Sequence, residues 1–259
     1  MARRSRPEAP LPPALPPETR PVGQLVAESI KLYRRRFWPS LALGLPVGVF
    51  GAVANRLDGW TYAIFSITGG ALLLTLSYVG ASLIVADRSI PRRRLLAAFA
   101  VGLVVFVPFP ALLLLYVLPA VAWLALVGLA VPVAVIEGPG FVASLKRGFQ
   151  LGRADYVHSL GALAALAILF YLSTRVLAVA LNAGSGQAAE IARPLAEGVL
   201  WPVVVLGAGL LYFDQAARVE SGRPRSRRSD ADLHHAHEPD RSGRADPEGE
   251  PRPAAGSQP

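Results

Sequence analysis

Hydrophobic side chains occur in long uninterrupted runs that are separated by short charged segments. Asp, Glu, Lys and Arg are absent from residues 59–86, 95–136, 156–174 and 198–213. A helix needs about 20 residues to cross the ~30 Å hydrocarbon core of a bilayer, because each residue adds about 1.5 Å. The run 95–136 is long enough for two crossings, and we expect it to turn back near Leu118 and Pro119. The pattern therefore predicts an all-α polytopic membrane protein.

About six transmembrane helices follow from this pattern. We place them at residues 39–56, 61–86, 95–116, 119–137, 157–181 and 195–213. Several of these spans contain proline, for example Pro46, Pro132 and Pro202, and we expect kinks there. The alternative is that the prolines break the helices to line a cavity, as in transporters. We assign residues 22–215 to the membrane domain. The Pro- and Arg-rich residues 1–21 and the polar residues 216–259 are predicted to be disordered, the latter as a cytoplasmic tail.

Two short segments have the periodicity of amphipathic helices. In residues 22–38, Val26, Ile30, Tyr33 and Phe37 recur at helical spacing, and Leu25, Ser29 and Leu32 form a neighbouring stripe. In residues 140–154, Phe141, Leu145 and Phe149 recur every four residues. Both segments precede a predicted span and are followed by a helical hairpin. We predict two cytoplasmic interfacial helices, and their short shared pattern suggests a parallel repeat.

The distribution of charge predicts the orientation in the membrane. The chain has 53% hydrophobic and 17% charged residues and a net charge of +8. With the N-terminus inside, the cytoplasmic segments contain all the Lys and Arg except Arg56, Arg175 and Arg193, as the positive-inside rule requires. Both termini are then cytoplasmic. Because the positive charge is divided among these segments, we expect no nucleic-acid partner.

The basic residues of the cytoplasmic segments are candidates for contact with anionic lipid head groups of the inner leaflet or with a partner protein. They are Lys31, Arg34, Arg35, Arg36, Arg92, Arg93, Arg94, Lys146, Arg147 and Arg153. The acidic residues Asp87, Glu137 and Asp214 lie at the inner ends of spans, where they can extend to the interface or pair with the arginines at 88 and 92–94. Near the outer ends, Arg175 and Glu197 are a candidate intramembrane ion pair, and interfacial anchoring is the alternative.

The residues for catalysis are scarce. The chain has no cysteine, and the membrane domain has a single histidine, His158. HExxH, P-loop and dinucleotide-binding motifs are absent, and the small residues 182–186 lack the Gly-x-Ser-x-Gly order of a serine nucleophile. We therefore expect no catalytic site, no bound metal and no cofactor.

Three stretches resemble one family of bacterial membrane proteins. They are residues 23–37, beginning Gly-Gln-Leu, residues 132–151, with Ala-Ser-Leu-Lys-Arg-Gly-Phe-Gln-Leu, and residues 211–220, with Leu-Tyr-Phe-Asp. Together they resemble the membrane domain of glycerophosphodiester phosphodiesterases, and the resemblance covers residues 22–220. It implies a six-helix membrane domain. Phosphodiesterase members carry a catalytic barrel after this domain, whereas about 45 residues follow the sixth span here, fewer than a barrel needs, so we do not expect that activity.

These observations favour a multi-pass protein of a bacterial plasma (inner) membrane. Lys31 and Lys146 are the only lysines, and this preference for Arg fits a GC-rich bacterial genome. We expect a scaffold or partner subunit at the inner leaflet, with membrane lipids and another membrane protein as partners. A transporter or channel component for a small solute or lipid is the alternative, and a lipid-handling enzyme or its accessory is a third hypothesis.

Overall fold

The computed structural model describes residues 20–87, 89–181 and 186–221, and these residues are helical with short connections. The helices are α1 (Val22–Arg35), α2 (Phe37–Ala54), α3 (Gly59–Phe65), the π-helix η2 (Ser66–Gly70), α4 (Ala71–Ala86), α5 (Arg92–Phe106), α6 (Pro108–Leu115), α7 (Val117–Val127), α8 (Ala130–Ile136), α9 (Phe141–Ala154), α10 (Tyr156–Leu181) and α11 (Gly186–Ser221). The predicted all-α class is confirmed. The predicted disorder of residues 1–19 and 222–259 lies outside the described residues.

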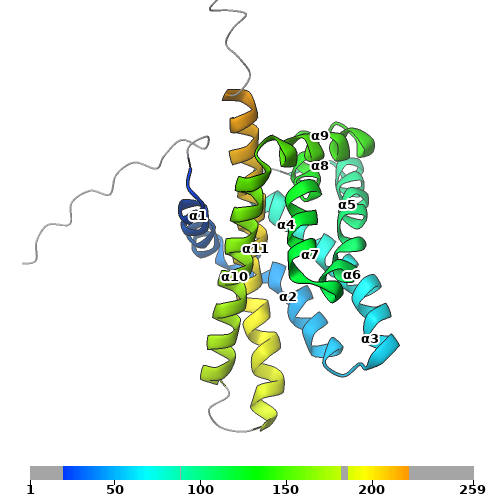
Figure 1. The fold of residues 1–259 in the computed structure, drawn as a ribbon, viewed down its shortest axis with the longest axis vertical. Coiled ribbons are helices and arrows are strands. Elements are labelled where there is room, and N and C mark those ends of the chain that lie inside the picture. The colour runs from blue at the N-terminus through cyan, green and yellow to red at the C-terminus, as the bar shows by residue number, and fades with distance from the viewer. Residues whose placement is uncertain (1–19, 88, 182–185, 222–259) are drawn as a thin grey trace, which may run out of the picture. The chain divides into compact units, whose positions relative to one another are not determined.

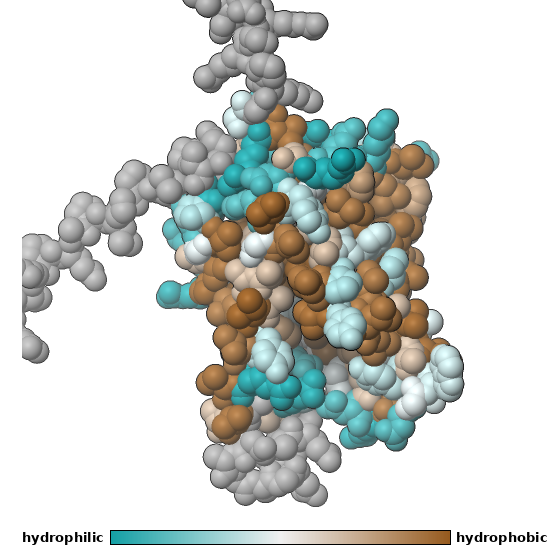
Figure 2. Space-filling view, viewed as in Figure 1, coloured by the Kyte–Doolittle hydropathy of each residue, from teal (hydrophilic) through white to brown (hydrophobic). Residues whose placement is uncertain are grey.

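Six helical segments in the described part of the chain are long and apolar enough to cross a membrane. They are Phe37–Ala54, Gly59–Ala86, Arg92–Leu115, Val117–Ile136, Tyr156–Leu177 and Ala192–Ser221. Large apolar side chains on their outer faces are exposed, for example Leu45, Val157 and Val176 at 64%, 80% and 70%. Figure 2 shows this hydrophobic surface across the middle of one face, with hydrophilic residues gathered towards the top and bottom. The chain is therefore a polytopic membrane protein, as predicted.

An extended residue and several prolines shape the ends and the interior of the spans. Tyr116 is extended (φ −162°, ψ 151°) and by itself reverses the chain between α6 and α7, slightly before the predicted turn. Pro119 lies in the first turn of α7, where the missing N–H removes no helical hydrogen bond. Pro132 follows Gly128 and Leu129, which interrupt the fourth span between α7 and α8, and its missing N–H leaves the Gly128 carbonyl group without an i→i+4 partner, as expected for a kink. Pro46 and Pro202 lie inside helices α2 and α11.

The second span changes its helical geometry at its centre. Residues Ser66–Gly70 form a π-helical turn between α3 and α4. The sequence Thr-Gly-Gly within it has low helix propensity, and the Thr68 hydroxyl donates a hydrogen bond to the Ile64 carbonyl oxygen at 2.7 Å. A side chain that bonds the preceding turn in this way stabilises an irregular helix in the absence of water.

Helix α11 is the centre of the helical body. It packs against α1, α2, α4, α9 and α10, and Figure 1 shows it beside α10 as one arm of a long hairpin. It crosses α2 at glycines: a Cβ atom on Gly44 would collide with the Gly198 carbonyl group. Small residues such as Gly44 and Gly48 permit this close crossing, as is common between helices in membranes. The two helices therefore approach backbone to backbone.

The last helix extends further than predicted. We assigned residues 216–259 to a disordered tail, but α11 continues to Ser221. Asp214 and Gln215 are fully buried, and Arg218 pairs with Asp155. These contacts hold the extra turns, and no glycine or proline lies between Asp214 and Gly222. At the other terminus, Arg20 is anchored by ion pairs although we placed it in the disordered segment 1–21.

Candidate functional site

Helix α1 presents one face to the bundle and another to its surroundings. Leu25 and Ser29 are fully buried, and Leu25 packs in a cluster with Leu211 and other apolar residues of neighbouring helices. The predicted stripe that contains Ile30 is partly open: Ile30 is exposed by 40%, and Phe37, which continues the stripe at the start of α2, by 43%. The helix therefore docks through the Leu25 stripe and leaves part of the apolar face available to lipid.

Helix α9 also packs against the bundle with one face and exposes another. It begins after Gly138-Pro139-Gly140, where both glycines have positive φ (66° and 101°) that side-chain-bearing residues rarely adopt. Its buried stripe contains Ser144, Gly148 and Gly152, and a Cβ on Gly148 would collide with the Ala130 backbone on α8. The apolar Phe141 and Val142 are exposed instead, by 39% and 72%. The glycines of α9 form the face that packs against α8, and the face with Phe141 is therefore left exposed.

The predicted basic residues lie on these two helices and on the first turn of α5, and they fall into two groups. The exposed ones are Lys31, Arg34, Arg35, Arg92, Arg93, Lys146 and Arg153. The partly buried ones are Arg36, Arg94 and Arg147. Arg36 forms an ion pair with Asp87, and Arg147 lies 3.6 Å from the Glu137 carboxylate. The Arg153 guanidinium lies over the Phe149 ring, 5.5 Å from its centroid.

A polar cluster joins the start of α1 and the end of α9 to the last turns of α11. The Arg20 guanidinium contacts Asp214 at 2.7 Å and Glu28 at 3.2 Å, and the Asp214 side chain is fully buried. Arg218 binds Asp155 at 2.9 Å and the Arg20 carbonyl oxygen at 3.3 Å. These contacts place α1 and α9 at the same end of the helical body, which we call the α1/α9 end.

The acidic residues at this end pair with arginines other than 92–94, and the predicted partner Arg88 lies outside the described residues. Asp87, Glu137 and Asp214 pair with Arg36, Arg147 and Arg20, respectively. The Tyr212 hydroxyl also donates to Glu137 at 2.8 Å. Arg20 and Asp214 are 194 positions apart, and no local pattern links them. The structure therefore identifies Arg20 as a residue that the sequence reasoning missed.

The predicted pair of Arg175 and Glu197 is not formed. Glu197 contacts Arg193, one helical turn away on α11, at 2.9 Å. The Arg175 guanidinium lies over the Tyr171 ring on its own helix, 5.0 Å from the centroid. Each charge has a partner at a spacing of four residues, and such local pairs form with less loss of side-chain freedom than a pair between helices. Arg175 therefore fits the alternative of interfacial anchoring.

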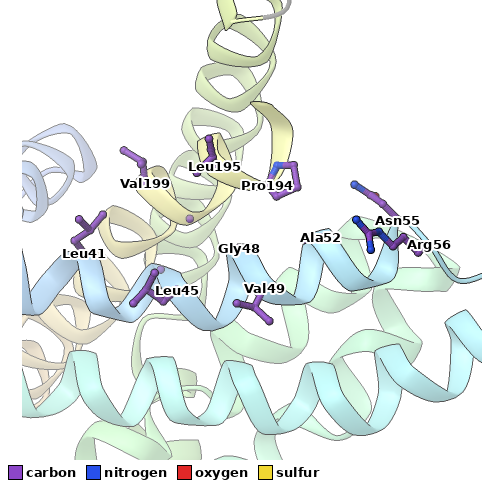
Figure 3. A pocket seen from close by; sticks show the side chains of 12 residues that line it. Leu41, Leu45, Gly48, Val49, Ala52, Asn55, Arg56, Pro194, Leu195 and Val199 are labelled. Atoms are coloured by element: carbon purple, nitrogen blue, oxygen red, sulfur yellow. The ribbon is translucent and has the colours of Figure 1, made fainter. Parts of the chain in front are cut away.

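A groove opens at the surface between α2 and α11 and includes their glycine crossing. Its volume is about 910 Å³. Figure 3 shows Pro194, Leu195 and Val199 on the α11 side of the groove, with Asn55 and Arg56 together at one end. The other lining residues of α2 are apolar or glycine: Leu41, Gly44, Leu45, Gly48, Val49 and Ala52. The groove is therefore apolar along its length and polar at one end.

Within residues 20–87, 89–181 and 186–221, no group of three or more His, Cys, Asp or Glu side chains could hold a metal ion. Comparison with protein families, curated proteins and solved structures finds no match to the chain. The resemblance to the phosphodiesterase membrane domain stays a prediction from the sequence.

Proposed function

We propose that the chain is a multi-pass protein of the bacterial plasma membrane that acts, without a catalytic site of its own, as a scaffold or partner subunit at the inner leaflet. Both termini are cytoplasmic in this proposal. The observation that supports it most is that α1 and α9 both lie at the α1/α9 end, where each helix packs against the body with one face and exposes the other.

Two physical contributions act at this end. Exposed apolar side chains such as Ile30, Phe37 and Val142 insert at the boundary between head groups and acyl chains. The seven exposed basic residues attract anionic lipid, at about 1 kcal/mol for each charge near the surface. Six spans already anchor the chain, so these helices are not needed to hold it in the membrane. They are free to present a surface to a second membrane protein.

A charge-removal experiment tests this role. The triple variant Lys31→Gln, Arg34→Gln, Arg35→Gln removes exposed charges from α1, and none of the three side chains forms an ion pair with a described residue. The control Arg56→Gln, Arg175→Gln removes exposed charges from the opposite end. After mild solubilisation, we expect one membrane protein to co-purify at a constant ratio with the wild type and the control, and to be lost from the triple variant.

Two results would count against the scaffold role. One is isolation as a lone monomer under every mild condition. The other is equal loss of the partner from the triple variant and from the control, which would show that charge at the α1/α9 end has no special part. Size-exclusion profiles of each variant show whether it is folded.

A transporter or channel component is the second candidate. The groove beside α11 and the prolines inside that helix, Pro194 and Pro202, favour it, because interrupted helices line substrate sites in transporters. Proteoliposomes should then show solute or lipid flux that falls with Pro202→Ala. Vesicles that stay tight to a range of solutes, with no lipid exchange, would exclude this role.

A further inference from the structure

The groove between α2 and α11 has the polarity of an amphiphile. Its walls are apolar, with Leu45, Val49 and Leu195 exposed by 64%, 58% and 57%. Its polar side chains, Asn55 and Arg56, lie together where α2 ends (Figure 3). We propose that the groove binds one acyl chain of an anionic phospholipid of the leaflet opposite the α1/α9 end, with the lipid phosphate against Arg56.

The length of the groove suits an acyl chain. The lining of α2 runs from Leu41 to Arg56, which is about 22 Å at 1.5 Å per residue. Half of a ~30 Å hydrocarbon core is about 15 Å, so an acyl chain that begins at Arg56 extends across its leaflet within the groove.

Glycine and proline create the space. Gly44, Gly48 and Gly198 bring the two backbones together, so no side chain rises between the helices at the floor. Pro194 lines the same wall within α11. A half-open channel of this composition inside a bilayer is filled by hydrocarbon, because water there would find few polar partners.

Charge selects the head group. Arg56 is exposed and forms no ion pair with any described residue. Glu197, the acidic side chain on the α11 side, is already paired with Arg193. A guanidinium binds phosphate oxygens with two parallel hydrogen bonds, and the nearby Asn55 amide adds a donor. The polar end therefore suits an anionic phosphate.

Native mass spectrometry of the full chain in mild detergent tests the proposal. Phosphatidylglycerol and phosphatidylcholine with the same acyl chains are added separately. We expect the wild type to retain phosphatidylglycerol about fivefold better, the factor that corresponds to about 1 kcal/mol for one basic side chain. Arg56→Gln should abolish the preference, whereas Arg175→Gln, at the same end, should keep it.

A second pair of variants tests the groove itself. Val49→Trp fills it, and Ile168→Trp adds the same side chain at a matched exposure (59% against 58%) on α10, outside the groove. Val49→Trp should lower retention of both lipids, and Ile168→Trp should not. Equal retention of the two lipids by the wild type, an unchanged preference in Arg56→Gln, or equal effects of the two tryptophans would overturn the proposal. A dimer that dissociates in Val49→Trp would also overturn it, by assigning the groove to a second copy. None of these outcomes depends on the scaffold role or on which leaflet is cytoplasmic.

Discussion

Replacing Asp214 by Asn tests whether the polar cluster holds α1 to α11. The substitution keeps the shape of the side chain and removes its charge. The Asp214 side chain is fully buried, and the Arg20 guanidinium 2.7 Å away has 11% exposure. Loss of the carboxylate therefore leaves a largely buried cation without its nearest counter-charge.

The expected cost follows from these contacts. Breaking a buried ion pair by removing one partner costs about 3–5 kcal/mol. Arg20 keeps Glu28 at 3.2 Å, so we expect a smaller loss in the free energy of unfolding, about 2–3 kcal/mol. The exposed Arg193–Glu197 pair provides the comparison, since its side chains have 58% and 18% exposure. Removing its charge by Arg193→Gln should cost about 0–1 kcal/mol.

The measurement is unfolding by sodium dodecyl sulfate in mixed micelles, followed by tryptophan fluorescence. Asp214→Asn, Arg20→Gln and the double variant complete a cycle that isolates the pair. We expect the double variant to be more stable than the sum of the single losses predicts, by about 1 kcal/mol or more. A loss below about 0.5 kcal/mol in Asp214→Asn, or strictly additive losses, would refute the argument that this pair tethers α1.

Three further predictions concern packing and orientation. Gly148→Ala should lower the free energy of unfolding by about 1–3 kcal/mol, because the added Cβ pushes α9 away from Ala130. Gly161→Ala, where a Cβ meets no other atom, should be neutral or stabilising in the same assay, and equal effects of the two variants would contradict the close packing. The Ser77 hydroxyl accepts a hydrogen bond from the Trp201 indole and donates one to the Leu43 carbonyl oxygen, both at 2.8 Å. Ser77→Ala should therefore lower the free energy of unfolding by about 1–2 kcal/mol and shift the fluorescence emission of Trp201. An unchanged spectrum and an unchanged stability would argue against this bridge. Because the chain has no cysteine, single cysteine substitutions report the side of the membrane on which each residue lies. Arg35→Cys and Lys146→Cys should react with an impermeant maleimide only after lysis of spheroplasts, whereas Arg56→Cys should react in intact spheroplasts. The reverse pattern would invert the proposed orientation.

The candidate site was only partly predictable. Helical periodicity identified α1 and α9 and their basic residues, because the spacing of side chains around a helix is a local property. The face of α9 that docks was not evident, since Gly148 and Gly152 carry no hydrophobic signal and act only through the backbone that approaches them. The Arg175–Glu197 pair was wrong because proximity along the membrane normal does not bring two side chains together on neighbouring helices, whereas Arg193 was available one turn from Glu197.

The sequence alone determined the all-α class, the six spans and the amphipathic segments, because the length of a hydrophobic run and the spacing of its residues follow directly from helix geometry and bilayer thickness. Tertiary structure decided which helices touch. It brought Arg20 to Asp214 across 194 positions, crossed α2 and α11 at glycines, and opened the groove that ends at Arg56. Such contacts depend on how whole helices pack against one another, and a pattern read along one helix contains no information on its neighbour.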